Sequence, residues 1–342
     1  MFAKCLNWWN NIIMTRKILV AGAGGFIGGW LVNSLIKNGF NQHQIVCVDI
    51  KSINEWYQVF DSTENHVLDL SDPMSCLEVT QNVEHIYNLA ADMGGMGFIE
   101  NNKALCMLSV LINTNLLLAA KKNKVKKYFF ASSACVYSAL TQTSPNNLGL
   151  KESDAYPADP EDGYGWEKLF SERMCRHFYE DFGVETRVAR FHNVYGPNGT
   201  WNGGREKAPA AICRKVAEAQ ITGKYEIEIW GDGSQTRSFT YIDDAVQGIH
   251  LLMNSDIREP INIGSSELVD LNKLTSIVEQ IAQVPKLNRT YNLSAPRGVV
   301  GRNSDNTKVL NLLRWEPKIE LKIGLSKTYQ WVHSQILAKQ LY

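Results

Sequence analysis

The stretch KILVAGAGGFIG, residues 17–28, decides the fold. Its apolar run breaks directly into glycines, which predicts a strand that ends in a tight turn, and helical spacing follows over 26–38. Glycines at this spacing let the backbone approach a pyrophosphate closely, and the start of the helix favours the phosphate charge. The strand and helix contexts are both present, so a dinucleotide site is favoured over a plain strand–helix turn. The candidate cofactor contacts in this turn are Gly22, Gly25, Phe26, Ile27 and Gly28.

Acidic residues follow the next two predicted strands. Asp49 ends the strand predicted over 44–49, about 20 residues past the last glycine, where a carboxylate binds the ribose 2′-hydroxyl. This acid favours NAD over NADP, although Lys51 lies nearby. Asp69, in the strand predicted over 66–70, is either a contact for the adenine amino group or an acid that serves a turn.

Strands and helices alternate along the first half of the chain. Such alternation predicts an α/β fold with a Rossmann-type, doubly wound parallel sheet. We expect residues 17–195 to form the NAD-binding domain, with 242–264 returning to it. Residues 196–241 and 265–342 are expected to form a smaller, mixed α/β substrate-binding domain. The further strands are predicted at 85–91, 127–133, 185–191, 226–230 and 261–263, and the further helices at 99–122, 164–182, 208–220 and 243–254.

Composition excludes several classes of function. The chain has 342 residues, 44% of them hydrophobic, which is enough for one large α/β core. Lys plus Arg (35) balances Asp plus Glu (35), so no basic field favours nucleic acid. Seven scattered cysteines without a CxxC pair predict neither a metal site nor a disulfide framework, and they favour a reducing, cytoplasmic location. Residues 1–16 form an extension too short and too polar to span a membrane, and Met14 is an alternative start.

A catalytic set follows the predicted cofactor site. Tyr164 and Lys168 share one helix face, and an ammonium near the phenol would lower its pKa and make it a usable base. Ser133 lies at the end of the strand predicted over 127–133. Together with Tyr164 and Lys168, it completes a Ser/Tyr/Lys set for hydride transfer. Cys135 follows at once, and a thiol there suggests proton transfer beyond simple oxidation. Lys207, in GGREKAP, is a second candidate acid or base.

Four short motifs together resemble the extended short-chain dehydrogenase/reductase family: GAGGFIG (22–28), NLAA (88–91), SSA (132–134) and YxxxK (164–168). Longer strings are similar to those members of the family that invert GDP-mannose at C3 and C5. These strings include ADMGGMGFIE (91–100), SSACVY (132–137), RFHNVYGPNGTWNGGREKAPAAICRK (190–215) and GRNSDN (301–306).

The resemblance implies an NAD cofactor, GDP-D-mannose as substrate, GDP-L-galactose with some GDP-L-gulose as products, and a homodimer with interface candidates at 99–122 and 164–182. It implies that Tyr164 takes the C4 hydroxyl proton, that Lys168 binds the nicotinamide ribose and that Ser133 holds the C4 oxygen. Cys135 and Lys207 would then move protons at C3 and C5. Further contacts implied with cofactor or substrate are Gly94, Ala134, Asn193, Glu206, Ala208, Lys215, Gln235, Thr236, Arg237 and Arg302.

Two positions depart from the family pattern. Val300 and Ser138 stand where an arginine and a proline are expected, so the implied diphosphate contact rests more on Arg302. The chemistry is consistent without the resemblance, because a ketone at C4 acidifies C3 and C5, and inversion needs an acid and a base on opposite ring faces. A thiol suits the base if a nearby cation favours its thiolate.

Three alternatives remain at this point. A 4,6-dehydratase needs a carboxylate beside the SSA segment, and Ala134-Cys135 offers none. A 4-epimerase does not need the pair Cys135 and Lys207. A non-enzymatic NAD-binding scaffold predicts the loss of Tyr164 or Lys168, and both are present.

Overall fold

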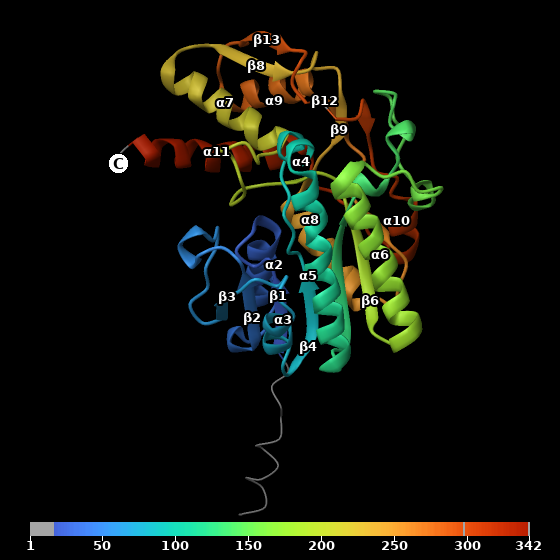
Figure 1. Ribbon diagram of the computed structural model, residues 1–342. Helices are drawn as coiled ribbons and strands as arrows, with labels where there is room; N and C mark the ends of the chain where they lie inside the picture. The colour runs from blue at the N-terminus through green and yellow to red at the C-terminus, as the bar shows by residue number, and fades with distance from the viewer. Residues whose placement is uncertain (1–16, 297, 341–342) are drawn as a thin grey trace, which may run out of the picture.

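A computed structural model describes residues 17–296 and 298–340 of the chain (Figure 1). Its centre is a seven-stranded sheet with the order β11-β6-β5-β4-β1-β2-β3, in which every neighbouring pair is parallel. The predicted doubly wound fold is therefore confirmed. The strands are β1 (Lys17–Ala21), β2 (Ile45–Asp49), β3 (Glu64–Val67), β4 (Val83–Asn88), β5 (Lys127–Ser133), β6 (Glu185–Phe191) and β11 (Ile261–Ile263).

Helices cover both faces of the sheet. The helices α2 (Phe26–Lys37) and α8 (Ile242–Asn254) pack on one face, and α3 (Pro73–Val79), α5 (Lys103–Lys122) and α6 (Asp162–Phe182) pack on the other. Alternate residues of β1 serve the two faces, because side chains of a strand point to opposite sides. Ile18 and Val20 join the first core, and Leu19 and Ala21 join the second. A central strand buried on both faces explains the continuous apolar run of the sequence.

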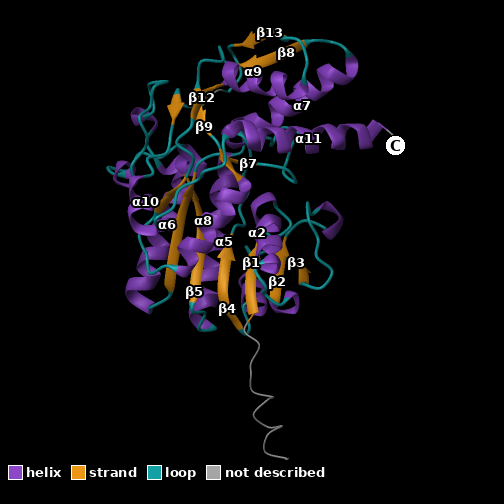
Figure 2. Ribbon diagram, turned by 180° about the vertical axis from the view of Figure 1, so that it is seen from behind, coloured by secondary structure: helices purple, strands orange, loops and turns teal. Residues whose placement is uncertain are grey.

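The second domain lies at the end of the sheet where the strands finish, and Figure 2 shows the sheet strands side by side beneath it. Small sheets and the helices α7, α9, α10 and α11 build this domain. The pair β8 and β13 is parallel, β9 joins β12 and β14, and β7 pairs with β10. Its elements are β7 (Val194–Tyr195), α7 (Ala208–Thr222), β8 (Glu226–Trp230), β9 (Thr236–Ser238), β10 (Thr240–Tyr241), β12 (Leu268–Asp270), α9 (Leu271–Ala282), β13 (Asn288–Asn292), β14 (Gly301–Arg302), α10 (Thr307–Leu313) and α11 (Leu321–Gln340).

Residues 242–264 return to the large sheet, because β11 pairs with β6 at its edge. The domain boundaries themselves stay predictions. The expected extension over residues 1–16, with Met14, lies outside the described residues.

Three predicted elements differ from the structure. The helix predicted over 99–122 is two helices, α4 (Met96–Asn101) and α5, which meet at Asn102 (φ −134°, ψ 43°). The Asn102 side chain donates to the Phe98 carbonyl, the kind of local bond that competes with a helix. Strand β3 ends at Val67, and Asp69 lies in the turn that follows, where it accepts from the Ser71 amide. Strand β4 ends at Asn88 rather than at residue 91.

Candidate active site

The glycine turn between β1 and α2 has the geometry of a phosphate cradle. Gly22 has a φ of +80°, and a Cβ there would lie 2.9 Å from the Ala90 backbone nitrogen. A Cβ at Gly28 would lie 2.0 Å from the Gly22 carbonyl oxygen, so the helix packs against the turn only with glycine. Within 17–296 and 298–340, no side chain caps the start of α2 at Gly25, and its amides can bind a phosphate. The turn therefore fits the pyrophosphate of NAD.

The two predicted acidic contacts lie at neighbouring strand ends. Asp49 is nearly buried at the end of β2 and accepts from the Lys51 amide at 3.1 Å. Asp69 is exposed and accepts from the Ser71 amide at 2.8 Å. The turn role of Asp69 is thus present in the structure, and its adenine contact stays a prediction.

The predicted catalytic side chains Ser133, Cys135 and Tyr164 lie together where β5 ends and α6 begins. Cys135, Tyr164 and Cys106 form one buried cluster, and the Ser133 hydroxyl lies close enough to lower the pKa of the Tyr164 phenol. Ser133 Oγ also accepts from the Cys135 amide at 3.2 Å. Gly165 allows the close packing, because a Cβ there would lie 2.3 Å from the Cys135 carbonyl oxygen. The predicted thiol thus lies against the predicted hydride-transfer set.

The Lys168 ammonium lies near the Tyr164 ring and also forms an ion pair with the carboxylate of Glu167. Its Nζ is 3.3 Å from Glu167, with both side chains buried, and 5.5 Å from the centre of the Tyr164 ring. Burial raises the pKa of Tyr164 well above its usual value, the charge of Cys135 adds to this, and the bond to Ser133 opposes it. Burial thus dominates the pKa of the Tyr164 phenol, and the lowering by Lys168 stays a prediction.

Lys207 stands immediately before α7, with Ala208 as the first helical residue. Burial lowers the pKa of Lys207, and the negative charge of Cys135 opposes this shift. The positive end of the helix dipole also disfavours an ammonium at this place. In the structure, Lys207 is therefore close enough to Cys135 for the sulfur to influence its pKa, although the two residues are far apart in the sequence.

A second loop holds the backbone beside Lys207. The Gly95 amide donates to the Arg205 carbonyl at 3.0 Å, and a Cβ at Gly95 would lie 2.5 Å from the Glu206 carbonyl oxygen. Arg205 also pairs with Asp92 at 3.1 Å and lies 3.7 Å from the centre of the Phe98 ring. The predicted contact Gly94 is buried in the same loop. Sequence reasoning missed Gly95, Asp92 and Arg205, although all three lie in strings that carried the resemblance.

Two arginines from the second domain approach Cys135. Arg302 Nη1 is 3.5 Å from Cys135 Sγ. Arg237 donates to the Val299 carbonyl at 2.6 Å, and burial lowers its pKa to about 10, with the charge of Cys135 opposing the shift. The sequence predicted both arginines as substrate contacts and did not predict their approach to the thiol.

The other predicted substrate contacts lie just before α7, on α7, on β9 and just after β5. Glu206 pairs with Arg214 at 3.1 Å, and Lys215 donates to the Glu228 carbonyl at 2.7 Å. Thr236 donates to the Pro145 carbonyl at 2.5 Å, and Ala134 is buried beside Cys135.

Gln235 and Asn193 show features typical of ligand contacts. Gln235 donates to the Trp230 carbonyl, while its buried Oε1 finds no hydrogen-bond partner among the described residues. Such an orphaned acceptor is suited to a donor on a ligand. Asn193 has a φ of +42° and donates to the Ser238 carbonyl at 3.1 Å.

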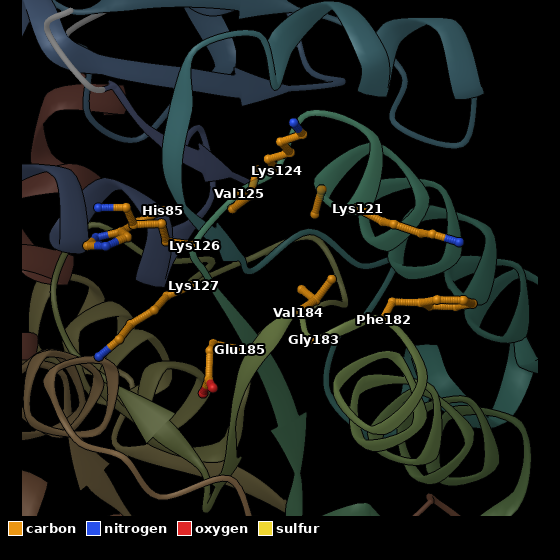
Figure 3. Close-up of a pocket in the computed structure, with 11 residues that line it drawn as sticks. His85, Lys121, Lys124, Val125, Lys126, Lys127, Phe182, Gly183, Val184 and Glu185 are labelled. Atoms are coloured by element: carbon orange, nitrogen blue, oxygen red, sulfur yellow. The ribbon is translucent and has the colours of Figure 1, made fainter.

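A hollow of about 520 Å³ lies far from these residues (Figure 3). Its lining includes Lys127 and Glu185, the first residues of β5 and β6, whereas Ser133 ends β5. The hollow is therefore at the amino ends of the strands. In parallel α/β sheets, ligands bind outside the carboxyl ends, so this hollow does not belong to the catalytic site.

A glycine turn for a dinucleotide, together with Ser133, Tyr164 and Lys168 at the carboxyl end of a parallel sheet, is typical of an NAD-dependent enzyme. The chain belongs to the NAD dependent epimerase/dehydratase family, which matches residues 18–264. The predicted family, enzyme class and cofactor are confirmed by this membership.

The chain is also similar to particular members of this family. It is 46% identical over 321 residues to "GDP-mannose 3,5-epimerase" of Arabidopsis thaliana, covering 94% of this chain and 83% of that protein. It is 48% identical over 323 residues to "GDP-mannose 3,5-epimerase 1" of Oryza sativa subsp. japonica, covering 94% and 82%.

Solved structures share the fold. The UDP-glucose 4-epimerase of Thermotoga maritima superposes with a TM-score of 0.83 at 24% identity, over 94% of this chain and 100% of that one. The UDP-glucuronic acid 4-epimerase of Bacillus cereus, solved with UDP-glucuronic acid and NAD, has a TM-score of 0.78 at 26% identity, over 96% and 100%.

Proposed function

We propose that the chain converts GDP-D-mannose to GDP-L-galactose, with some GDP-L-gulose, by inversion at C3 and C5. The observation that carries the proposal is that Cys135 lies in one buried cluster with Tyr164 and also acts electrostatically on the buried Lys207. A 4-epimerase has no use for a thiol and a second acid beside the hydride-transfer set. The identity of 46% and 48% to two GDP-mannose 3,5-epimerases, over nearly the whole chain, supports the same substrate.

In this mechanism, Tyr164 holds the proton of the C4 hydroxyl, and Ser133 hydrogen-bonds the C4 oxygen. NAD, held at the glycine turn and by Lys168, would supply reversible hydride acceptance from C4, so the overall reaction would involve no net oxidation. The C4 ketone makes the C3 and C5 hydrogens acidic. Cys135 and Lys207 then exchange protons at these carbons as a base and an acid. The lowered pKa of Lys207 suits it to give up a proton.

Incubation with GDP-D-mannose in D₂O should place deuterium at both C3 and C5, because each inversion returns a proton drawn from solvent. Mass spectrometry and NMR of the recovered sugar would measure the label. Tyr164→Phe is the matched control and should incorporate little, since the ketone forms slowly without the phenol. Unlabelled carbons in sugar recovered from active enzyme would contradict the proposal and favour a 4-epimerase.

We also propose that the chain forms a homodimer through α5 and α6. By length and composition α5 would suffice to cross a membrane, yet it packs on α3 and α6 and buries Leu116 and Leu117 in the core. Its other face is apolar and exposed, and α6 adds neighbouring exposed aromatics. A second copy of the chain supplies a matching apolar face. The exposed residues are Met107, Leu108, Leu111 and Leu118 on α5, with Trp166 and Phe170 on α6.

The double variant L108E/L111E should sediment as a monomer, because two charges would be buried in the proposed interface. Analytical ultracentrifugation would compare it with the unchanged chain, which is expected at twice 38.5 kDa. Leu293→Glu, at an exposed leucine in the second domain, is the control and should remain dimeric. A mass of one chain for the unchanged protein would rule out the dimer.

A further inference from the structure

Arg302 reaches Cys135 from the far end of the chain. It lies on β14, which pairs with β9, and its Nη1 is 3.5 Å from Cys135 Sγ. The Arg302 side chain is only 6% exposed. A buried guanidinium at this distance donates a hydrogen bond to sulfur, and the bond strengthens when the sulfur carries a negative charge.

Two side chains hold the guanidinium in this orientation. Glu161 forms an ion pair with Nη2, and the Glu161 amide donates to the Cys135 carbonyl at 2.9 Å. Glu161 therefore contacts both residues: its carboxylate pairs with Arg302 and its amide donates to the Cys135 carbonyl. Gln142, fully buried, accepts from Arg302 Nε at 2.7 Å.

The orientation of Gln142 follows from its other partners. Its Nε2 donates to the carbonyls of Tyr137 and Ser138, at 3.3 and 3.0 Å, which leaves Oε1 to face Arg302. The close approach of β14 requires glycine, because a Cβ at Gly301 would lie 2.0 Å from the Ser144 carbonyl oxygen. Arg302 is therefore held in a rigid frame.

We propose that Arg302 is a positioning residue for Cys135: held by Glu161 and Gln142, it orients the sulfur and stabilises its thiolate during proton transfer. This role rests on the function proposed above and differs from the diphosphate contact that the resemblance implies for Arg302. Arg302 Nε donates to Gln142, Nη1 donates to Cys135, and Glu161 pairs with the guanidinium, so these contacts favour a role at the sulfur.

Alkylation of Cys135 tests the proposal without any sugar. The NAD-loaded enzyme is treated with iodoacetamide across a pH series, and the Cys135 peptide is quantified by mass spectrometry. Among the described cysteines Cys135 is the most exposed, at 7%, so it should react first. The alkylation rate of Cys135 at pH 7 is divided by its plateau rate at high pH, where all of the thiol is ionised. This ratio corrects for any change in the access of iodoacetamide to the sulfur.

Arg302→Met should lower this ratio about 10-fold, because the thiolate loses a charge-assisted hydrogen bond. The ratio for Arg302→Lys should lie between those of Arg302→Met and the unchanged enzyme, because lysine keeps the positive charge but lacks the planar guanidinium donors. Arg289→Met is the matched control. It also removes a buried arginine from a pair with a glutamate, at 3.1 Å, but in a different part of the second domain, and it should leave the ratio unchanged.

Kinetics with GDP-mannose separate the two roles of Arg302. A positioning role predicts that Arg302→Lys lowers kcat for deuterium exchange while KM changes little. An unchanged alkylation ratio in Arg302→Met, with a raised KM, would overturn the proposal in favour of a diphosphate contact. If the unchanged enzyme fails to exchange deuterium while alkylation still depends on Arg302, the proposed substrate falls and the contact between Arg302 and Cys135 stands.

Discussion

Cys135→Ala should lose deuterium incorporation at C3 and C5 by a factor of about 10² to 10⁴, the usual contribution of a positioned acid or base. The thiol lies against Tyr164 and within reach of Arg302, and alanine offers no group that can accept a proton. NAD binding should persist, because the glycine turn is formed by other residues. Single-turnover exchange measured by mass spectrometry, beside a titration with NAD, would give both values.

A second cysteine variant separates this effect from a general loss of packing. Cys213→Ala removes an equally small, fully buried side chain from α7, where the cysteine joins the core rather than the catalytic cluster. It should bind NAD and exchange deuterium like the unchanged enzyme. Exchange that persists in Cys135→Ala would remove the thiol from the mechanism, and the pair with Lys207 would then fail as a description of the site.

Lys207→Met should lower the epimerisation rate by a similar factor of about 10² to 10⁴ and at the same time stabilise the protein near neutral pH. Burial holds the pKa of Lys207 below its usual value of 10.5, so the folded state binds the proton less tightly than the unfolded state does. Between these two pKa values the unfolded state carries more protons, and stability rises with pH. Below both pKa values, Lys207 is charged in the folded and the unfolded state, and the folded state carries the full free-energy cost of burying the ammonium. Methionine has no charge and removes this cost.

Urea unfolding across a pH series would test the stability part of this prediction. The midpoint for Lys207→Met should exceed that of the unchanged protein at pH 7, and the difference should shrink as the pH approaches 10.5. Lys273→Met, at an exposed position of α9, is the control and should show no such dependence. A difference that does not vary with pH would mean that the stabilisation comes from packing and not from the ammonium. Gain of stability with loss of activity is common at catalytic residues.

Local sequence was enough to predict many of the strands and helices in the nucleotide-binding half of the chain. Strands β1, β5 and β6 begin and end where predicted, because each is an apolar run bounded by a turn or a glycine. Tyr164 and Lys168 share a helix face by their spacing alone. The division of one predicted helix at Asn102 escaped the pattern, because a single side-chain bond to the Phe98 carbonyl decided it.

The catalytic pair shows the limit of local pattern more clearly. Cys135 and Lys207 were matched to roles by resemblance, and neither spacing nor composition places one near the other. The backbone beside Lys207 is packed against the loop at Gly95, where a side chain would meet the Glu206 carbonyl, and local sequence does not record this contact. The lowering of the Tyr164 pKa by Lys168 stays a prediction, and burial, which the sequence does not state, is the largest influence on this phenol in the structure.

By itself, the sequence determined the α/β class, the dinucleotide turn and the hydride-transfer set, since these depend on contacts within one strand, turn or helix. Only the tertiary structure decided which cation lies against Cys135. Arg302 stands 167 residues further along the chain and reaches the sulfur because β14 pairs with β9 and Glu161 binds both partners. Contacts at that separation arise from the packing of two domains, and no local periodicity records them.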